Sequence, residues 1–262
     1  AQGALAYVQP VLRRIDEVQA FSGAAAIQAE PCPLEKDITF DHISFRYPQA
    51  QAESSDALQD ICLTIPKGTK LGFIGASGSG KSTLIGILTG LFAPTQGQVL
   101  IDGRALTQER QAGWMEGIGY VPQSTFLLNA SIAQNIAFSQ WGKPIDKQKI
   151  LECCRMAAMD FVFDLPDGIN TLVGERGIRL SGGQVQRISV ARALYKNPHT
   201  LILDEATSAL DGASEKEIMD MIQGLNTEIT VIIVAHRLST VEHCNYVYWL
   251  KDGKLHSSGN PV

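Results

Sequence analysis

The stretch Leu71-Gly72-Phe73-Ile74-Gly75-Ala76-Ser77-Gly78-Ser79-Gly80-Lys81-Ser82-Thr83 decides the fold of this 262-residue chain. A short apolar strand leads into a glycine-rich loop, and the residues from Gly75 to Thr83 fit the pattern GxxxxGK[ST]. The loop then opens a helix that we expect to run from Lys81 to about Gly90. Strand, loop and helix in this order predict a backbone cradle for phosphate. The alternative, a flexible Gly/Ser loop, does not explain the Lys-Ser-Thr ending.

The chemistry of phosphate binding gives the residues of this loop distinct expected roles. Glycines let the backbone wrap the β-phosphate and direct N–H groups at it. Lys81 is expected to reach the β- and γ-phosphates, and the Ser82 hydroxyl is expected to coordinate Mg²⁺. The predicted nucleotide-binding residues of the loop are Gly75, Ser77, Gly78, Gly80, Lys81, Ser82 and Thr83. The expected cofactors are ATP and Mg²⁺.

A second apolar run, Leu201-Ile202-Leu203, ends in the adjacent carboxylates Asp204 and Glu205. Carboxylates at the end of a buried strand are costly unless they serve a cation or a reaction. Asp204 is placed to hold Mg²⁺, directly or through water. Glu205 is placed as the general base that polarises an attacking water. The alternative is a strand that ends at the surface with ordinary acidic residues, which the upstream phosphate loop makes a poorer explanation.

The segment Leu180-Ser181-Gly182-Gly183-Gln184 has the features of a second phosphate-binding helix start. Ser181 and Gln184 have the spacing of a capping box, and two glycines leave backbone N–H groups open to an anion. By themselves, these five residues describe a glycine-containing helix cap. Beside the upstream phosphate loop, they suggest a site that is completed by two subunits.

Composition and charge exclude several other classes of protein. The hydrophobic fraction of 45% supports a large core, and the net charge of −5 comes without a basic run, so we expect no nucleic-acid partner. The five cysteines form no CxxC pair, which indicates neither a zinc site nor a disulfide framework. No apolar run reaches the ~20 residues that a membrane span needs.

The phosphate loop, then Leu180–Gln184, then Leu201–Glu205, in that order along the chain, resemble the nucleotide-binding domain of an ABC transporter over roughly residues 37–259. The resemblance implies an α/β P-loop ATPase with a parallel-sheet core, an N-terminal antiparallel β part and a helical insertion, the ABC ATPase fold. In this family the signature LSGGQ contacts the γ-phosphate of ATP that is held by the other subunit. It therefore implies nucleotide contacts in trans for Ser181, Gly182, Gly183 and Gln184, and a homodimer with two competent sites.

Further residues match the family in place. Tyr47 resembles the aromatic that stacks on adenine, although a core strand aromatic is the alternative. Gln123 resembles the glutamine that senses Mg²⁺ and the attacking water. Asp211, in Ser208-Ala209-Leu210-Asp211, resembles a loop that crosses to the partner subunit. His236 resembles the histidine that contacts the γ-phosphate. The resemblance thus implies Glu205, His236 and Gln123 as catalytic residues, and Ser82, Gln123 and Asp204 as metal ligands.

Two segments indicate an exporter within this family. Thr171-Leu172-Val173-Gly174-Glu175-Arg176-Gly177 resembles a loop that touches the intracellular loops of an exporter's membrane domain; a surface turn is the alternative. Residues from Leu5 to Val18 have helical periodicity and resemble the end of the last membrane helix. The expected organisation is therefore linker and helix end at 1–36 and nucleotide-binding domain at 37–262, with a helical subdomain at about 127–196.

The resemblance implies an ATPase that powers export or flipping of a substrate across a membrane by ATP-driven head-to-tail dimerisation. Its own membrane domain is expected upstream, and the ends of the chain are expected to be trimmed. We expect this part to be soluble, at the cytoplasmic face of the inner or plasma membrane. A soluble ABC ATPase without transport, and a nucleotide-gated interaction domain without catalysis, are the rival interpretations; Glu205 argues against the second.

Overall fold

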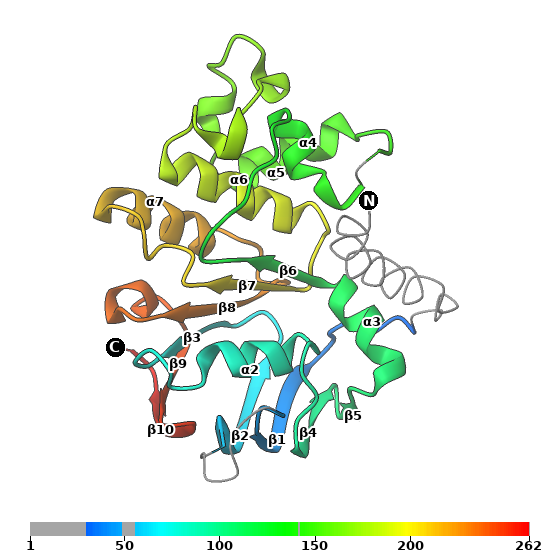
Figure 1. Ribbon diagram of the computed structural model, residues 1–262, viewed down its shortest axis with the longest axis vertical. Coiled ribbons are helices and arrows are strands. Elements are labelled where there is room, and N and C mark those ends of the chain that lie inside the picture. Colours follow the sequence, from blue (N-terminus) through cyan, green and yellow to red (C-terminus); the bar gives the residue numbers. More distant parts are fainter. Residues whose placement is uncertain (1–29, 49–55, 141, 262) are drawn as a thin grey trace, which may run out of the picture.

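The computed structural model describes residues 30–48, 56–140 and 142–261, which form two β-sheets and a helical part (Figure 1). The helix predicted between Leu5 and Val18 lies outside the described residues, as does most of the expected linker up to residue 36. Among the described residues, no helix has both the length and the apolar character needed to cross a lipid bilayer.

The first sheet is antiparallel, with strand order β2-β1-β4-β5. Its strands are β1 (Asp37–Phe45), β2 (Leu58–Pro66), β4 (Gln96–Ile101) and β5 (Arg104–Ala105). Inward residues such as Ile38 and Phe40 alternate with less buried ones, as a sheet with one face on the core requires. The antiparallel β part expected at the N-terminus of the domain is confirmed.

The second sheet forms the centre of the protein, with strand order β10-β9-β3-β8-β7-β6. Its strands are β3 (Lys70–Ile74), β6 (Ile118–Val121), β7 (Thr200–Asp204), β8 (Thr230–Ala235), β9 (Tyr246–Lys251) and β10 (Lys254–Gly259). All neighbours pair in parallel except β9 and β10, which form a hairpin. Asp252 and Gly253, at its turn, both have positive φ, which fits the tight turn that the sequence indicates.

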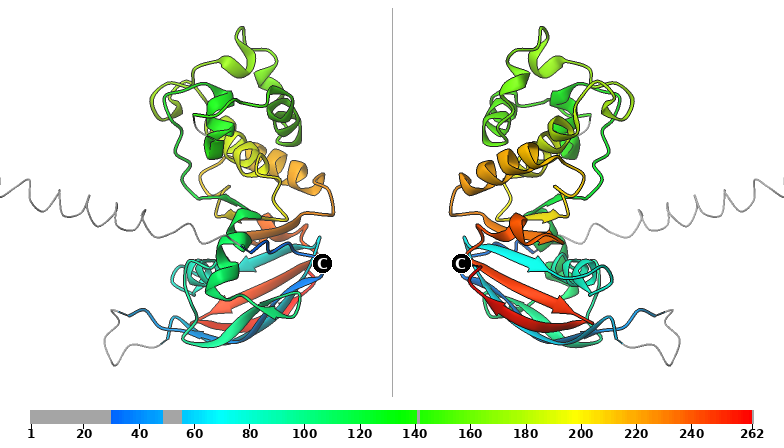
Figure 2. Two further views of the ribbon diagram at one scale, coloured as in Figure 1. Left: turned by 90° about the vertical axis from the view of Figure 1, so that its right-hand side faces the viewer. Right: turned by 90° about the vertical axis from the view of Figure 1, so that its left-hand side faces the viewer.

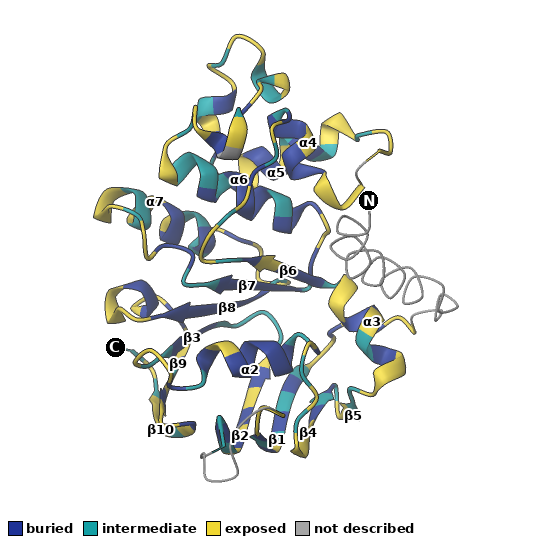
Figure 3. Ribbon diagram, viewed as in Figure 1, coloured by how far each residue is buried: buried dark blue, intermediate teal, exposed yellow. Residues whose placement is uncertain are grey.

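Apolar cores lie on both faces of this central sheet, because successive strand residues point to opposite faces. On β7, Leu201 and Leu203 pack into the core of the helical part, whereas Ile202 packs with residues of α2 (Lys81–Leu88) and the antiparallel sheet. The buried residues in Figure 3 follow the same two layers. This two-sided burial explains why the runs at β7 and β8 are continuously apolar.

The remaining helices lie on both sides of the central sheet. The first of them packs with α2 and the antiparallel sheet through Trp114, whereas the others cover the opposite face and extend away from it (Figure 2). In chain order, these helices are α3 (Gln108–Glu116), α4 (Ile132–Ile136), α5 (Lys147–Met156), α6 (Gly182–Leu194) and α7 (Gly212–Gln223), with 3-10 turns η1 (Phe138–Gln140), η2 (Asp160–Val162), η3 (Gly168–Asn170), η4 (Glu175–Gly177) and η5 (Leu238–Val241). The sequence did not indicate α3, α7, β5 or β10. The exact bounds of the expected helical subdomain, about 127–196, stay a prediction.

His199 is held where strands β6 and β7 begin, at the end of the central sheet opposite the phosphate loop. Its ring stacks on Trp114 with centroids 4.7 Å apart, and Nδ1 lies 3.1 Å from Thr200 Oγ1. A Cβ on Gly117 would come within 1.9 Å of His199 Nε2, so only glycine leaves room for the ring. Burial lowers the pKa of His199 from 6.5 to about 4.

The free energy of unfolding is therefore expected to fall as the pH drops from the ordinary value of 6.5 towards 4. The unfolded chain binds a proton at His199 in this range and the folded protein does not, so acid favours unfolding. Protonation of His199 in the unfolded chain lowers the free energy of unfolding by about 2 kcal/mol between about pH 7 and pH 5. Urea unfolding at both pH values should show that His199→Asn removes this part of the dependence. The same change at the exposed His243 should leave it intact, and equal effects of the two variants would contradict the assignment.

Candidate functional site

The register of the parallel strands brings three segments to one edge of the central sheet. Ile74, the last residue of β3, pairs with Ala235, the last residue of β8. Asp204, the last residue of β7, pairs with Val234. The residues that follow the three strands, Gly75, His236 and Glu205, therefore emerge side by side at the carboxyl ends, where open α/β sheets bind their ligands.

The loop after β3 has the backbone of a phosphate cradle. Gly78 and Gly80 have φ values of 77° and 105°, which favour glycine. A Cβ on Gly80 would come within 2.9 Å of the Ala57 carbonyl oxygen, whereas the space beside Gly78 is open. Helix α2 begins directly after this loop, and its N-cap residue, Gly80, has no side chain to cap the first N–H groups. Those N–H groups are available to an anion.

Lys81 lies inside the loop rather than in solvent. Its exposed fraction is 4%, and Nζ donates to the carbonyl oxygens of Gly75, at 2.8 Å, and Ala76, at 3.0 Å. Burial lowers the pKa of Lys81, while the carboxylates of Glu205 and Asp204 oppose that shift. The ammonium group is thus held beside the loop with its charge balanced by the two acidic residues.

Glu205 is the centre of a hydrogen-bonded group that joins the three strand ends. Its φ of 51° is unusual for a residue other than glycine and turns the chain sharply after β7. Oε2 accepts from Gln123 Nε2 at 2.9 Å, and Oε1 lies 2.5 Å from His236 Nε2. His236 Nδ1 is 3.0 Å from the Gly75 carbonyl oxygen, so Nδ1 must carry a hydrogen. The His236–Glu205 contact is an ion pair when Nε2 carries one too.

A cavity of about 300 Å³ opens at this group and at the phosphate loop. Its lining includes the predicted site residues Tyr47, Ser77, Gly78, Gly80, Lys81, Ser82, Thr83, Glu205 and His236. Gly75 is tied to the same place through its carbonyl oxygen. The structure thus brings together, at one edge, most of the residues that the sequence nominated separately.

Tyr47 stands at the rim of this cavity, and the residue is 43% exposed. Phe45 and Phe92 pack edge-on against the ring, with centroids 5.0 and 5.8 Å away, and the hydroxyl lies 2.9 Å from Thr83 Oγ1. The ring is therefore braced from behind but still open to a flat ligand. A buried core aromatic, the alternative from the sequence, does not describe this position.

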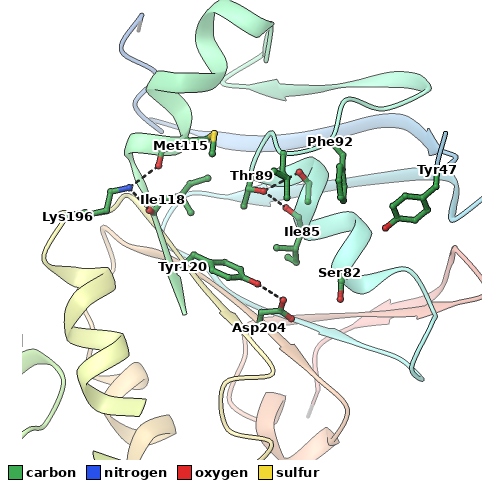
Figure 4. A pocket seen from close by; sticks show the side chains of 12 residues that line it. Tyr47, Ser82, Ile85, Thr89, Phe92, Met115, Ile118, Tyr120, Lys196 and Asp204 are labelled. Carbon is green, nitrogen blue, oxygen red and sulfur yellow. Dashed lines mark hydrogen bonds between the residues drawn. The ribbon is translucent and has the colours of Figure 1, made fainter. Parts of the chain in front are cut away.

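A second, more apolar cavity of about 550 Å³ adjoins the first and shares Tyr47 and Ser82 with it (Figure 4). Asp204 and Ser82 both line it, so two of the predicted Mg²⁺ ligands face a common space. Tyr120, which the sequence did not indicate, donates to Asp204 Oδ2 at 2.7 Å. Burial, together with this bond, raises the pKa of Tyr120. The tyrosine therefore stays a neutral donor that orients the Asp204 carboxylate.

The signature residues lie apart from both cavities. Ser181 is the N-cap of α6, and both bonds of the predicted capping box are present: Gln184 N to Ser181 Oγ, at 3.2 Å, and Ser181 N to Gln184 Oε1, at 3.0 Å. The box uses the N–H groups of Ser181 and Gln184. The N–H groups of Gly182 and Gly183 stay available, which is the arrangement of an anion site.

Asp211 lies next to the signature rather than at the phosphate loop. It caps α7 by accepting from Ala213 N, Ser214 N and Ser214 Oγ, and the bonds from Ser214 lower its pKa. A Cβ on Gly183 would lie 3.3 Å from Ser214 Oγ, so the starts of α6 and α7 are neighbours. Neither the signature nor Asp211 lines the two cavities described above, so their predicted contacts with nucleotide stay a prediction.

The segment from Gln123 to Leu127 connects the Glu205 group to the signature helix. At one end Gln123 donates to Glu205. At the other, Arg192 of α6 donates to the Phe126 carbonyl oxygen at 2.9 Å, and Thr125 Oγ1 donates to Gln186 Oε1 at 3.2 Å. Arg192 was not evident from sequence, because an arginine at helical spacing usually faces solvent.

Comparisons with known proteins agree with this geometry. The ABC transporter family profile matches residues 58–208, more than half of the chain. The chain is 43% identical over 228 residues to the ATP-dependent lipid A-core flippase of Sodalis glossinidius. The aligned region covers 87% of this chain and 38% of the flippase. It is 41% identical over 219 residues to the ABC-type transporter fsqE of Aspergillus fumigatus, covering 83% of this chain and 17% of that protein.

A solved structure of a bacterial Atm1-family ABC exporter with ATP bound superposes with a TM-score of 0.80 at 31% identity, covering 97% of this chain and 45% of that one. The chain thus spans less than half the length of these relatives. The expected fold is confirmed. The chain belongs to the ABC transporter family and is an ATP-binding domain with the ABC ATPase fold.

Proposed function

We propose that this chain hydrolyses MgATP in a site shared by two copies and thereby powers export or flipping of a substrate across a membrane. The observation that carries the proposal is the convergence of Lys81, Glu205 and His236 on one cavity, while the intact signature lies apart from it. The printed names of relatives, a lipid A-core flippase and an Atm1-family exporter, support transport as the purpose of hydrolysis.

The cavity fits a nucleoside triphosphate in shape and charge. The N–H groups at the start of α2 and the ammonium of Lys81 suit the phosphates, and the open face of Tyr47 suits the adenine. The oxygens of Ser82, Asp204 and Gln123 are the donors that Mg²⁺ prefers. When bound, Mg²⁺ supplies charge neutralisation at the phosphate oxygens.

The chain's own residues account for the hydrolytic step. A water attacks the γ-phosphorus, a P–O bond to water forms, and the bond to the bridging oxygen of ADP breaks. Glu205 accepts the proton that the water loses, and Gln123 holds its carboxylate in place. Lys81 stabilises the charge on the phosphate oxygens. The products are ADP and phosphate.

The second half of the site comes from a partner in this proposal. The free N–H groups of Gly182 and Gly183 start a 13-residue helix, and neither residue lines the cavity at the phosphate loop of the same chain. A head-to-tail homodimer places the signature of one copy over the phosphate loop of the other. Closure on MgATP and reopening after hydrolysis then form one cycle at two equivalent sites.

The membrane domain of the same protein is the proposed partner that uses this cycle, with the chain at the cytoplasmic face of the membrane. The segment from Gln123 to Leu127 supports the coupling route, because it bonds both to Glu205 and to the signature helix. Phe126 on this segment is 61% exposed, which leaves an apolar contact for a partner. Displacement of the segment would move both elements together.

Tyr47→Ala should weaken MgATP binding by roughly 10-fold or more, since stacking of a base on an aromatic ring contributes about 1–3 kcal/mol. Tyr47→Phe should bind within about threefold of the parent, because it keeps the ring and loses only the bond to Thr83. Isothermal titration with MgATP measures both affinities. If the two variants lose affinity equally, the ring does not stack on adenine.

Glu205→Gln should reduce the turnover number by about 10²- to 10⁴-fold, because the amide keeps the shape but accepts no proton from water. MgATP affinity should stay near that of the parent. Gel filtration with MgATP should show the variant trapped as a dimer, and phosphate release measures turnover. Unimpaired hydrolysis would refute the role of Glu205 as the base.

Ser181→Ala should lower turnover by roughly 10-fold while MgATP affinity at low protein concentration changes less than about twofold, because the signature acts on the partner's nucleotide. Ser131→Ala is a matched control, since Ser131 and Gln134 form the same capping box on α4. Both variants lose a helix cap, but only the first should lose turnover. Lys81→Ala is the converse control, because it should weaken the binding of MgATP to its own chain. Equal turnover of the two serine variants would show that Ser181 is only a cap.

A further inference from the structure

Glu215, in the first turn of α7, holds together two loops that enter the proposed active site. Its Oε1 accepts from Thr207 Oγ1 at 3.1 Å and from Thr240 Oγ1 at 2.7 Å. Thr207 belongs to the loop after β7, and Thr240 lies in η5, after β8. A single carboxylate oxygen thus joins segments from three elements.

The Glu215 bridge is enclosed by protein. The Glu215 side chain is 13% exposed, and both threonines are 5% exposed. Arg237 Nη1 approaches Oε2 only to 3.5 Å, and its side chain is 60% exposed. Since a carboxylate that loses water needs donors in its place, the two hydroxyls are the principal partners of this group. A bridge shielded from water keeps its geometry better than a surface ion pair does.

The two bridged loops carry the reacting groups. Thr207 is two residues after Glu205, and Thr240 is four residues after His236. Within the site, His236 and Glu205 touch directly through Nε2 and Oε1. In the proposed function His236 turns from Glu205 to the γ-phosphate of ATP, and this direct contact is then lost. The bridge through Glu215 involves neither reacting side chain, so it persists through that change.

We propose that Glu215 is a positioning residue. It fixes the loop of His236 relative to the loop of Glu205 while the His236 side chain changes its contact from Glu205 to the phosphate of ATP. The inference rests on the proposed hydrolysis of ATP for its kinetic part. The small cavity between the two loops, lined by Glu205, His236, Thr207, Thr240 and Glu215, places the bridge directly behind the reacting pair. Loss of the bridge therefore changes the rate of reaction more than the affinity for nucleotide.

A second role for Glu215 is stabilisation of α7, because an acidic residue near a helix N-terminus interacts favourably with the helix dipole. The two roles differ in their response to substitution. Glu215→Gln loses the charge but keeps an oxygen that accepts from both hydroxyls, whereas Glu215→Ala loses both. A dipole role predicts similar effects of the two variants; a bridging role predicts that glutamine rescues.

Steady-state ATPase kinetics of the purified protein test the bridge. We expect Glu215→Ala to lower kcat by roughly 10- to 100-fold with KM for MgATP within about twofold, as misplacement of a reacting group does. Glu215→Gln should keep kcat within about threefold of the parent. Asp220→Asn, an exposed acidic residue on the same helix, is the control and should change neither constant. Equal losses in the alanine and glutamine variants would overturn the proposal.

Substitution at the other end of the bridge gives an independent check. Thr240→Val removes the donor at nearly constant shape and should reproduce the loss of kcat, while Thr240→Ser should restore it. The double variant Glu215→Ala/Thr240→Val should cost no more than Glu215→Ala alone, because the two residues act through one bond. Additive losses would show that they act separately.

Hydrogen exchange separates this proposal from the proposed function, since it needs no turnover. In the absence of nucleotide, amides of residues 236–241 should exchange faster in Glu215→Ala than in the parent or in Glu215→Gln. Unchanged exchange would overturn the bridge even if the parent hydrolyses ATP. A parent protein without ATPase activity, but with this exchange pattern, would overturn the proposed function and leave the bridge in place.

Discussion

The parallel alignment of β3, β8 and β7 is the constraint on which the site depends. Because Ile74 pairs with Ala235 and Asp204 with Val234, the chain leaves all three strands at the same level. Three loops that are far apart in sequence then meet, and their polar groups satisfy one another. A slip of one residue in any of these pairings would turn every side chain of that strand to the other face and separate the loops.

The same alignment explains how the polar groups of the site hold one another in place. Lys81 bonds to carbonyl oxygens of its own loop, and Glu205 is held by Gln123 and His236. A phosphate therefore enters a place where the cation, the carboxylate and the free N–H groups at the start of α2 already stand. The signature, by contrast, has satisfied its own cap and keeps only two N–H groups for an anion. The phosphate loop and the signature are each fully folded within one chain. In the proposed function, neither can hydrolyse ATP without the other from a partner.

The sequence was sufficient to predict the strongly apolar strands and the helix cap of the signature. The strands at β6 and β8 have the predicted bounds, and the capping box of Ser181 and Gln184 is present as predicted. Helix α3 was missed because its residues are mostly polar; it is held by one fully buried side chain, Trp114, whose Nε1 donates to the Leu88 carbonyl oxygen. Strand β10 was missed because it is a polar edge strand that depends on its partner β9.

Residues that act through others were also beyond prediction. Tyr120 and Glu215 belong to no motif, and their roles come from partners 84 and up to 25 positions away. Such contacts follow from strand order, which periodicity does not reveal. The predicted roles of the signature and of Asp211 depend on a second copy of the chain.

A mixing experiment tests the shared site most directly. Lys81→Ala and Ser181→Ala each damage both sites of their own homodimer, so each protein alone should have at most about a tenth of the parent's rate. In a mixed dimer, Lys81 of one copy meets Ser181 of the other, and one site is intact while its twin carries both defects. ATPase activity should therefore reappear on mixing, up to about a quarter of the parent's rate if subunits pair at random and sites work independently. Absence of any recovery, with mixed dimers demonstrated in the sample, would contradict a site built from two copies.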